Sequence, residues 1–402
     1  MKKHLLIVLL GTTLSVVTAF ANPCKVVRTD VFNYITEPSL PNGSSLGAAT
    51  GAALVLKSDQ TTIIPVGGSS MGYLFLSPDH KNSHLLKMDP SVMYDYSVHE
   101  LGDHRIVIGS RVGDLYFLDH QGNLLSKFTV APHEGVYVNL VEKDDSLLVT
   151  SFTTGTLYRI STQGIITKLL TQKELSETYT TMQEFSDRHI ALSFMDPDAD
   201  ISLEFITPDG KVDFIVPNDN FFPNTFQSLS EISPGFVAIS GNHYMPGYTH
   251  AEASIALVNL SNKQITYTDL GNGKLVFIKE LNAGDYAMVF DNADGKEILQ
   301  YFHHNQKVWE KSQTNLLDDG SFTFAQLSDS TLVLPHGEQI QFFSPTGTLK
   351  AEFDFKGLDT DPTSHQDQYP VSPIRVLADD TVMVTQWFFK GVRFSYLKMT
   401  CE

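Results

Sequence analysis

The sequence predicts an all-β protein built from repeated four-stranded antiparallel sheets. Three observations carry this prediction: short runs of β-branched and aromatic residues, Gly and polar turns between the runs, and a recurrence of the whole pattern along the chain. One unit contains the runs Val136–Glu142, Ser146–Ser151, Thr156–Ile160 and Ile165–Leu169. Four short strands cannot form a stable core alone, so each unit requires neighbours of the same kind.

The repeat is set by an acidic turn that follows the first strand of each unit. The anchors are Asp59, Asp103, Asp144, Asp187, Ser233-Pro234-Gly235, Asp285, Asp329 and Asp379. Successive anchors lie 41 to 51 residues apart, which is typical of propeller blades with four strands each. Eight anchors predict a single eight-bladed β-propeller over residues 22–402, with seven blades as the alternative.

The last unit has only three strands of its own. We expect its outer strand to come from Lys25–Val31 at the other end of the chain, because closing the ring removes exposed strand edges. This exchange would bring Cys24 next to Cys401, the only two cysteines. We therefore predict a Cys24–Cys401 disulfide, as an oxidising compartment would allow.

Residues 1–21 have the pattern of a secretory signal peptide. Two lysines precede an apolar run from Leu5 to Leu10, and the segment ends in Ala19-Phe20-Ala21. We expect an exported protein, periplasmic or extracellular. No later segment is apolar for long enough to cross a bilayer, so membrane insertion is not expected.

The charge of the chain limits its partners. The sequence carries a formal net charge of −18, with 46 acidic and 28 basic residues. A surface this negative repels phosphate backbones, which excludes nucleic acid as a partner. We expect a monomer that interacts, if at all, with a protein or peptide.

Candidate binding residues occur on the first strands of the units. A carboxylate precedes the apolar end of this strand at Glu100, Glu184, Glu231 and Glu280. If this strand is innermost, such a ring of carboxylates could bind a cation or a basic peptide in the central channel. The alternative is that each carboxylate accepts hydrogen bonds from the neighbouring blade, since repeated residues often serve the architecture.

Two long connectors are further candidates, because binding residues on a rigid scaffold often lie in such loops. One is the insertion Gly241–Glu252, and the other runs from Gly357 to Tyr369. The insertion carries His243, Tyr244, Tyr248 and His250. The spacing of its histidines matches no zinc motif. The alternative is that these histidines lie on the surface without a binding role, and we predict no metal ligands.

The stretch Gly113-Asp-Leu-Tyr-Phe-Leu-Asp-His-Gln-Gly-Asn-Leu124 resembles units of bacterial exported propellers in the broad PQQ-like, WD40-like and SMP-30-like superfamilies. The resemblance implies a β-propeller fold over nearly all of residues 22–402. The tryptophans that dock PQQ-type blades are missing, since only Trp309 and Trp387 occur, and no Trp-Asp dipeptide is present. No site residue of these superfamilies can be placed on this chain, and fold alone does not give function.

Two functional hypotheses follow. The first is a non-catalytic binding module or scaffold that recognises a protein or peptide on one face of the ring. The alternative is an enzyme or small-ligand binder with its site at the mouth of the central channel. We predict no catalytic residues, because no nucleophile or phosphate-binding motif stands in a usable context. No cofactor is predicted either, with Ca²⁺ left open for the alternative.

Overall fold

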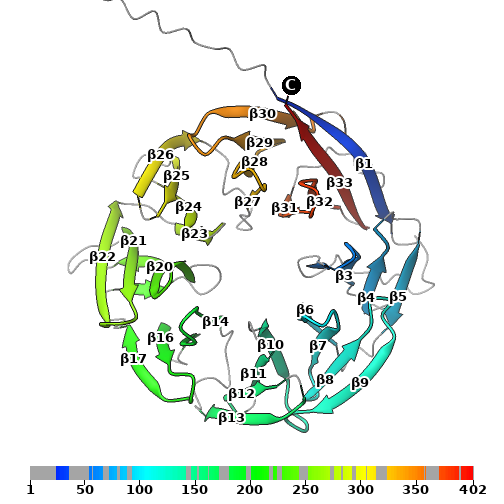
Figure 1. Cartoon of the computed structure of the whole chain (residues 1–402), viewed down its shortest axis with the longest axis vertical. Coiled ribbons are helices and arrows are strands. Elements are labelled where there is room, and N and C mark those ends of the chain that lie inside the picture. Colours follow the sequence, from blue (N-terminus) through cyan, green and yellow to red (C-terminus); the bar gives the residue numbers. More distant parts are fainter. Residues whose placement is uncertain are drawn as a thin grey trace, which may run out of the picture.

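The computed structural model is a closed ring of β-sheets (Figure 1). It describes residues 24–35, 54–56, 58–66, 72–78, 82–87, 93–141, 146–151, 154–161, 163–171, 181–195, 201–216, 221–223, 229–243, 252–271, 276–281, 284–291, 296–304, 306–313, 324–356, 358, 371–388 and 391–401. The signal peptide predicted over residues 1–21 lies outside these ranges. Within them the regular elements are all strands, and no helix could span a bilayer.

The described strands form eight antiparallel sheets, or blades, each listed here from the centre of the ring outward. Blades 1 to 4 are β2 (Leu54–Val55), β3 (Thr62–Val66), β4 (Gly72–Leu76), β5 (Ser83–Lys87); β6 (Met93–Glu100), β7 (Ile106–Ser110), β8 (Asp114–Leu118), β9 (Leu124–Thr129); β10 (Val136–Val141), β11 (Leu147–Ser151), β12 (Thr156–Ile160), β13 (Ile166–Thr171); and β14 (Thr181–Glu184), β15 (Ile190–Met195), β16 (Ile201–Ile206), β17 (Val212–Val216).

Blades 5 to 8 are β19 (Leu229–Ser233), β20 (Phe236–His243), β21 (Glu252–Asn259), β22 (Gln264–Gly271); β23 (Val276–Glu280), β24 (Asp285–Asp291), β25 (Glu297–His303), β26 (Gln306–Gln313); β27 (Ala325–Gln326), β28 (Leu332–His336), β29 (Gln339–Phe343), β30 (Leu349–Asp354); and β31 (Val371–Val376), β32 (Val382–Phe388), β33 (Gly391–Thr400), β1 (Lys25–Ile35). In blade 5, β18 (Phe221–Pro223) also pairs with β20. The prediction of eight blades is confirmed, and the seven-bladed alternative is wrong.

The hydrophobic core lies between neighbouring blades. Ile64 and Leu74 of blade 1, for example, pack with Met383 and Phe394 of blade 8. Similar clusters occur at the other blade junctions. The second strand of a blade is covered on both sides, as in β7, whose five residues are all buried. A strand of this kind is therefore continuously apolar, whereas the outermost strand β9 is largely exposed.

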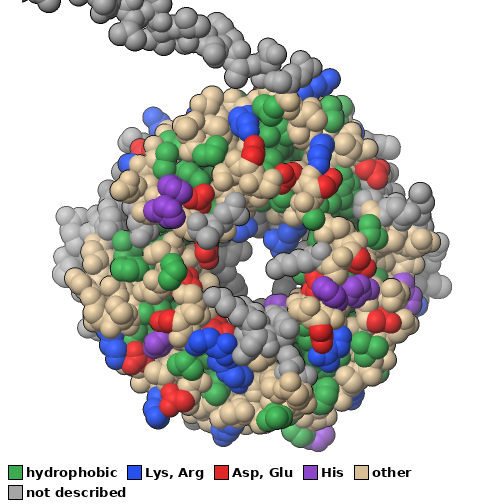
Figure 2. Space-filling model, in the orientation of Figure 1, with side chains coloured by type: hydrophobic (Ala, Val, Ile, Leu, Met, Phe, Trp, Pro, Cys, Tyr) green, Lys and Arg blue, Asp and Glu red, His purple; other side chains and the backbone are tan. Residues whose placement is uncertain are grey.

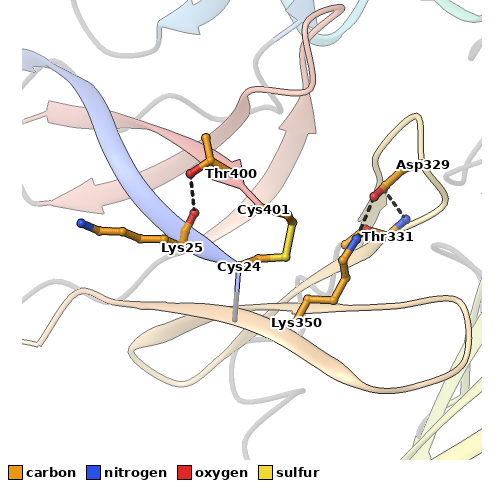
Figure 3. The surroundings of a disulfide bond; sticks show 7 residues. All are labelled: Cys24, Lys25, Asp329, Thr331, Lys350, Thr400 and Cys401. Carbon is orange, nitrogen blue, oxygen red and sulfur yellow. Dashed lines mark hydrogen bonds and ion pairs between the residues drawn. A yellow bond between two sulfur atoms is a disulfide. The ribbon is translucent and has the colours of Figure 1, made fainter. Parts of the chain in front are cut away.

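The ring closes as predicted, through the N-terminal strand. β1 pairs with β33 as the outer strand of blade 8, from Lys25↔Thr400 to Ile35↔Gly391. Cys24 and Cys401 form a disulfide with an S–S distance of 2.06 Å, and Thr400 Oγ1 donates to the carbonyl of Lys25 at 3.4 Å (Figure 3). In the other blades a hairpin joins the third strand to the fourth. The disulfide thus takes the place of that hairpin in blade 8.

The two faces of the ring carry different connections. We call the hairpin face the one with the turns between first and second strands, such as 101–105, 185–189, 327–331 and 377–381, and the hairpins between third and fourth strands. The connector face carries the links between blades, such as 130–135, and the links between second and third strands. The insertion Gly241–Glu252 joins β20 to β21 and therefore belongs to the connector face, although most of it lies outside the described residues.

Candidate functional site

The side chains of three predicted glutamates, Glu100, Glu184 and Glu231, contact the preceding blade. Glu100 Oε1 accepts a hydrogen bond from the backbone N–H of Ser58 at 3.2 Å. Glu231 Oε2 accepts one from the N–H of Ser186 at 2.7 Å and also accepts from the Ser186 hydroxyl. Both carboxylates therefore join two blades, which is the architectural alternative given for them above.

Glu184 joins two blades through charge. Its Oε1 lies 3.3 Å from Arg159 Nη2 of blade 3 and 2.9 Å from Arg188 Nε in its own blade. The Glu184 side chain is 5% exposed, so the two guanidinium groups meet it in a largely desolvated place. A carboxylate held by two cations in this way is not a free ligand for a further cation.

The same contact is made elsewhere by a different residue. The N–H of Ser328 in blade 7 donates to Asp380 Oδ1 of blade 8 at 2.8 Å, and the N–H of Ala378 in blade 8 donates to Gln60 Oε1 of blade 1 at 3.4 Å. Asp380 and Gln60 both have positive φ, of 62° and 64°. The left-handed backbone of the turn aims their side chains at the preceding blade. The glutamate contacts were an alternative predicted from sequence, whereas the contacts of Asp380 and Gln60 were not predicted.

The acidic anchors of the repeat have a local role. In the turns described, the anchor carboxylate accepts the N–H two residues later, as in Asp59 with Thr61 at 2.9 Å and Asp329 with Thr331 at 2.9 Å. Asp103, Asp187 and Asp379 make the same contact. Asp residues favour such turns because the side chain replaces a backbone acceptor. The recurrence of Asp therefore reflects turn geometry.

Asp285 does not belong to this series. It begins β24, and Gly284 rather than Asp285 occupies the positive-φ position of the turn, with φ of 86°. The anchor assigned to Asp285 is thus shifted by two residues. Glu280, at the predicted carboxylate position of this blade, is exposed, and its backbone N–H lies 3.4 Å from Ser230 Oγ.

Asp285 is the centre of a buried polar cluster. Its Oδ2 accepts hydrogen bonds from the Tyr301 hydroxyl at 2.6 Å and from Gln326 Nε2 of blade 7 at 3.1 Å, and its Oδ1 accepts from His303 Nδ1. Burial by itself would raise the pKa of Asp285, but these hydrogen bonds outweigh it and hold the pKa below its usual value. The pKa of Tyr301 is raised, by burial first and then by Asp285.

Two histidine pairs lie on the hairpin face, where Figure 2 shows imidazoles (purple) gathered over blade 6 and near the junction of blades 1 and 2. The His303 and His304 rings are 4.1 Å apart, although neighbouring side chains of an extended strand point apart. The reason is the positive φ of His304, 46°. In the other pair, His120 Nδ1 lies 2.9 Å from Asp59 Oδ2, and the His104 ring lies 6.0 Å away.

The wall of the central opening carries positive charge. Figure 2 shows Lys and Arg side chains (blue) at this wall, on the side where β27 and β31 lie in Figure 1. Lys279 of β23 and Arg375 of β31 are both partly buried on innermost strands. Burial, and next the charge of Arg375, lower the pKa of Lys279 to about 8. Burial also lowers the pKa of Arg375.

A small cavity of about 190 Å³ lies at the closing junction, between blades 8 and 1. Asp30, Gln60 and Tyr396 are among its lining residues. Burial raises the pKa of Tyr396, and the nearby charge of Asp30 adds to this effect. The cavity is too small for most organic ligands and has room for a few water molecules.

The loop candidates are not placed by the structure. His243 ends β20 and pairs with Glu252, but its side chain is not described, and Tyr244, Tyr248 and His250 lie outside the described residues. Among the side chains that are described, no group of three or more His, Cys, Asp or Glu residues could hold a metal ion.

Comparison with known proteins supports the fold. No protein-family model matches the chain, and no curated protein matches it in sequence. Among solved structures, the Dos1 propeller is similar with a TM-score of 0.58 and 10% identity, covering 92% of this chain and 95% of that chain. The WD40 domain of SCAP from fission yeast has a TM-score of 0.55 and 10% identity, with coverages of 93% and 98%.

BamB from Moraxella catarrhalis is also similar, with a TM-score of 0.49, 11% identity and coverages of 92% and 97%. At such low identity these likenesses concern the fold alone. The similarity to WD40-like propellers that the sequence predicted is confirmed at the level of the fold.

Lys279 and Arg375 were not among the residues predicted from sequence. They lie two residues before Leu281 and Leu377, the apolar residues at which their turns begin. At this position His99 Nε2 contacts the carbonyl of Val138 in the next blade at 2.7 Å. A comparison of the residues at this position, one residue before the predicted glutamates, would have identified the two cations from the sequence.

Proposed function

We propose that the chain is a non-catalytic binding scaffold that recognises a protein or peptide partner on one face of the ring. One observation carries this proposal: carboxylates that could have lined the channel instead accept hydrogen bonds from the preceding blade. Glu100 accepts from Ser58, and Glu231 accepts from Ser186. These contacts join the turns of neighbouring blades at the junctions where they occur and favour a rigid platform. A rigid surface loses little conformational entropy when a partner binds.

We further propose that the scaffold is exported and acts as a monomer in the periplasm or outside the cell. The pattern of residues 1–21 supports export, because it combines basic residues, an apolar run and Ala19-Phe20-Ala21. The Cys24–Cys401 disulfide supports the same compartment, since disulfides persist where the environment is oxidising.

Site-specific photocrosslinking in cells tests the scaffold proposal. A photoreactive amino acid is placed at His104 or His303 on the hairpin face, at Pro132 on the connector face, and on the outer rim at the exposed Ile215 of β17 and Tyr267 of β22. We expect a discrete crosslinked product from one face and none from the rim. Products from the rim alone, or no product from either face, would contradict the proposal.

A small-ligand binder at the channel mouth is the second candidate, and the cationic wall at Lys279 and Arg375 favours it. The same charge disfavours Ca²⁺ at this wall, because like charges repel. Metal analysis of the purified protein, with thermal unfolding measured with and without a chelator, tests whether Ca²⁺ binds elsewhere. Bound Ca²⁺ and a lower melting temperature in chelator would favour a calcium-dependent version of this candidate.

A further inference from the structure

We propose that Lys279 and Arg375 form a binding site for a small oxyanion in the wall of the central channel. The ligand would be a small molecule that carries carboxylate or phosphate groups. This inference rests on the second candidate function and specifies its ligand chemistry. It does not depend on the scaffold proposal.

The two cations occupy equivalent positions in blades 6 and 8. Each lies two residues before the turn of its innermost strand, and blade 7 stands between them with Ala325 at the same position. The methyl group of Ala325 fills little space. The side chains on either side of it can therefore approach the same part of the channel, in agreement with the electrostatic effect of Arg375 on Lys279.

The donors of the two residues are largely unused. Lys279 Nζ donates one hydrogen bond, to the carbonyl of Phe324 at 2.7 Å, and an ammonium group has three N–H donors. Within the described part of the chain, the Arg375 side chain forms neither a hydrogen bond nor an ion pair, and burial alone lowers its pKa. Its guanidinium group has five N–H donors in a fixed plane. Most of these eight donors are therefore available to a ligand.

This arrangement differs from that of other partly buried cations in the protein. Arg159 contacts Glu184 at 3.3 Å, and Lys350 contacts Asp329 at 2.8 Å. A chain with 46 acidic residues has many carboxylates to offer, yet none of those described lies within ion-pair distance of Lys279 or Arg375. A desolvated cation without a counter-charge is costly, so an anion bound between the two would offset this cost.

The side-chain chemistry fits an oxyanion. Arg binds carboxylate and phosphate oxygens in pairs through its planar fork, and Lys acts beside it as a compact positive charge. Burial also lowers the pKa of both groups. A bound anion would favour their charged forms and would therefore raise the pKa of Lys279 again.

The test is a titration of the full chain with sodium phosphate and, separately, with sodium citrate, at pH 7 and at constant ionic strength maintained with NaCl. Calorimetry measures the dissociation constant. We expect saturable binding of at least one of the two anions and a dissociation constant about tenfold or more higher in Arg375→Gln and in Lys279→Gln. Lys211→Gln on the exposed surface is the matched control and should bind as the unchanged protein does.

Saturable binding of neither anion would overturn the proposal, as would equal affinity in Arg375→Gln. Thermal unfolding checks that the variants fold. If Arg375→Gln does not fold, Arg375→Lys keeps the charge but loses the paired hydrogen bonds, and several-fold weaker binding is then expected. A negative crosslinking experiment would contradict the scaffold proposal without affecting the anion titration, because the crosslinking positions lie away from Lys279 and Arg375.

Discussion

The backbone N–H of Ser328 donates a hydrogen bond to Asp380 Oδ1 across the junction of blades 7 and 8, at 2.8 Å. The Ser328 hydroxyl donates to the other oxygen of the same carboxylate. One acidic side chain thus holds both polar groups of a residue in the preceding blade. Similar contacts, made by Glu100 and Glu231, join other blades.

We expect Asp380→Asn to lower the free energy of unfolding by about 1 kcal/mol, because hydrogen bonds to a charged acceptor are replaced by bonds to a neutral amide. Asn accepts the positive φ of this position, so the backbone adds little to the effect. Urea unfolding measures the change. Asp209→Asn, in an exposed hairpin within one blade, is the control. Equal effects of the two substitutions would contradict the interblade role.

Removing the disulfide should destabilise the ring. In the variant Cys24→Ser/Cys401→Ser we expect a loss of roughly 3–5 kcal/mol in the free energy of unfolding, since the crosslink restricts the unfolded chain. Unfolding in urea with and without reductant provides the measurement. Reductant should destabilise the unchanged protein and leave the double variant as it is. An unchanged midpoint in the double variant would show that strand pairing between β1 and β33 suffices.

The cluster around Asp285 predicts a pH-dependent contribution to stability. At pH 7 we expect Asp285→Asn to cost about 1–3 kcal/mol, because Tyr301 and Gln326 lose a buried charged acceptor. The folded pKa of Asp285 lies below the usual 3.8. The stabilisation is therefore complete above the unfolded pKa and disappears as the pH falls through the folded pKa. Urea unfolding between pH 7 and pH 3 should show the two proteins converging only in strong acid.

Lys279 predicts a dependence of the same sign at higher pH. Its folded pKa of about 8 lies below the ordinary 10.5, so the unfolded chain binds more protons between these values and stability rises with pH there. Relative to Lys279→Met, the unchanged protein should gain stability as the pH rises from 8 to 10.5. The same comparison with Lys211→Met, at an exposed position, should give no gain over this range, because Asp209 raises the pKa of Lys211 and the sign is therefore reversed. A flat difference for Lys279→Met would mean that the side chain is better hydrated than its surroundings indicate.

Blade packing can be tested at a glycine. Gly210 has a φ of +85°, and a Cβ atom there would lie 2.3 Å from the carbonyl oxygen of Leu169 in blade 3. Gly235 has a similar φ of +76° but nothing within 4 Å of such an atom. We expect Gly235→Ala to cost about 1–2 kcal/mol from backbone strain alone, and Gly210→Ala to cost clearly more. Thermal or urea unfolding that ranks the two equally would contradict this account.

The sequence predicted the fold better than the site, for a physical reason. Strand and turn patterns repeat in every blade, and the ring requires β1 to complete blade 8, so the pairing of Cys24 with Cys401 followed. The glutamates could be predicted from the sequence because they recur at one position of the repeat. Lys279 and Arg375 occur in two blades only, and their meeting depends on the curvature that brings β23 and β31 to one side of the channel. A single sequence contains no direct information on the distance between Lys279 and Arg375.

The pairing of β1 with β33 also constrains the order of events in the cell. Cys24 is made 377 residues before its partner Cys401, which at usual rates of translation is a delay of roughly 20–75 s. During that time the nascent polypeptide cannot complete its final sheet, and β1 presents an unpaired edge to chaperones, proteases and other copies of itself. Folding of the last blade therefore has to wait for the synthesis of β33, however early the others assemble.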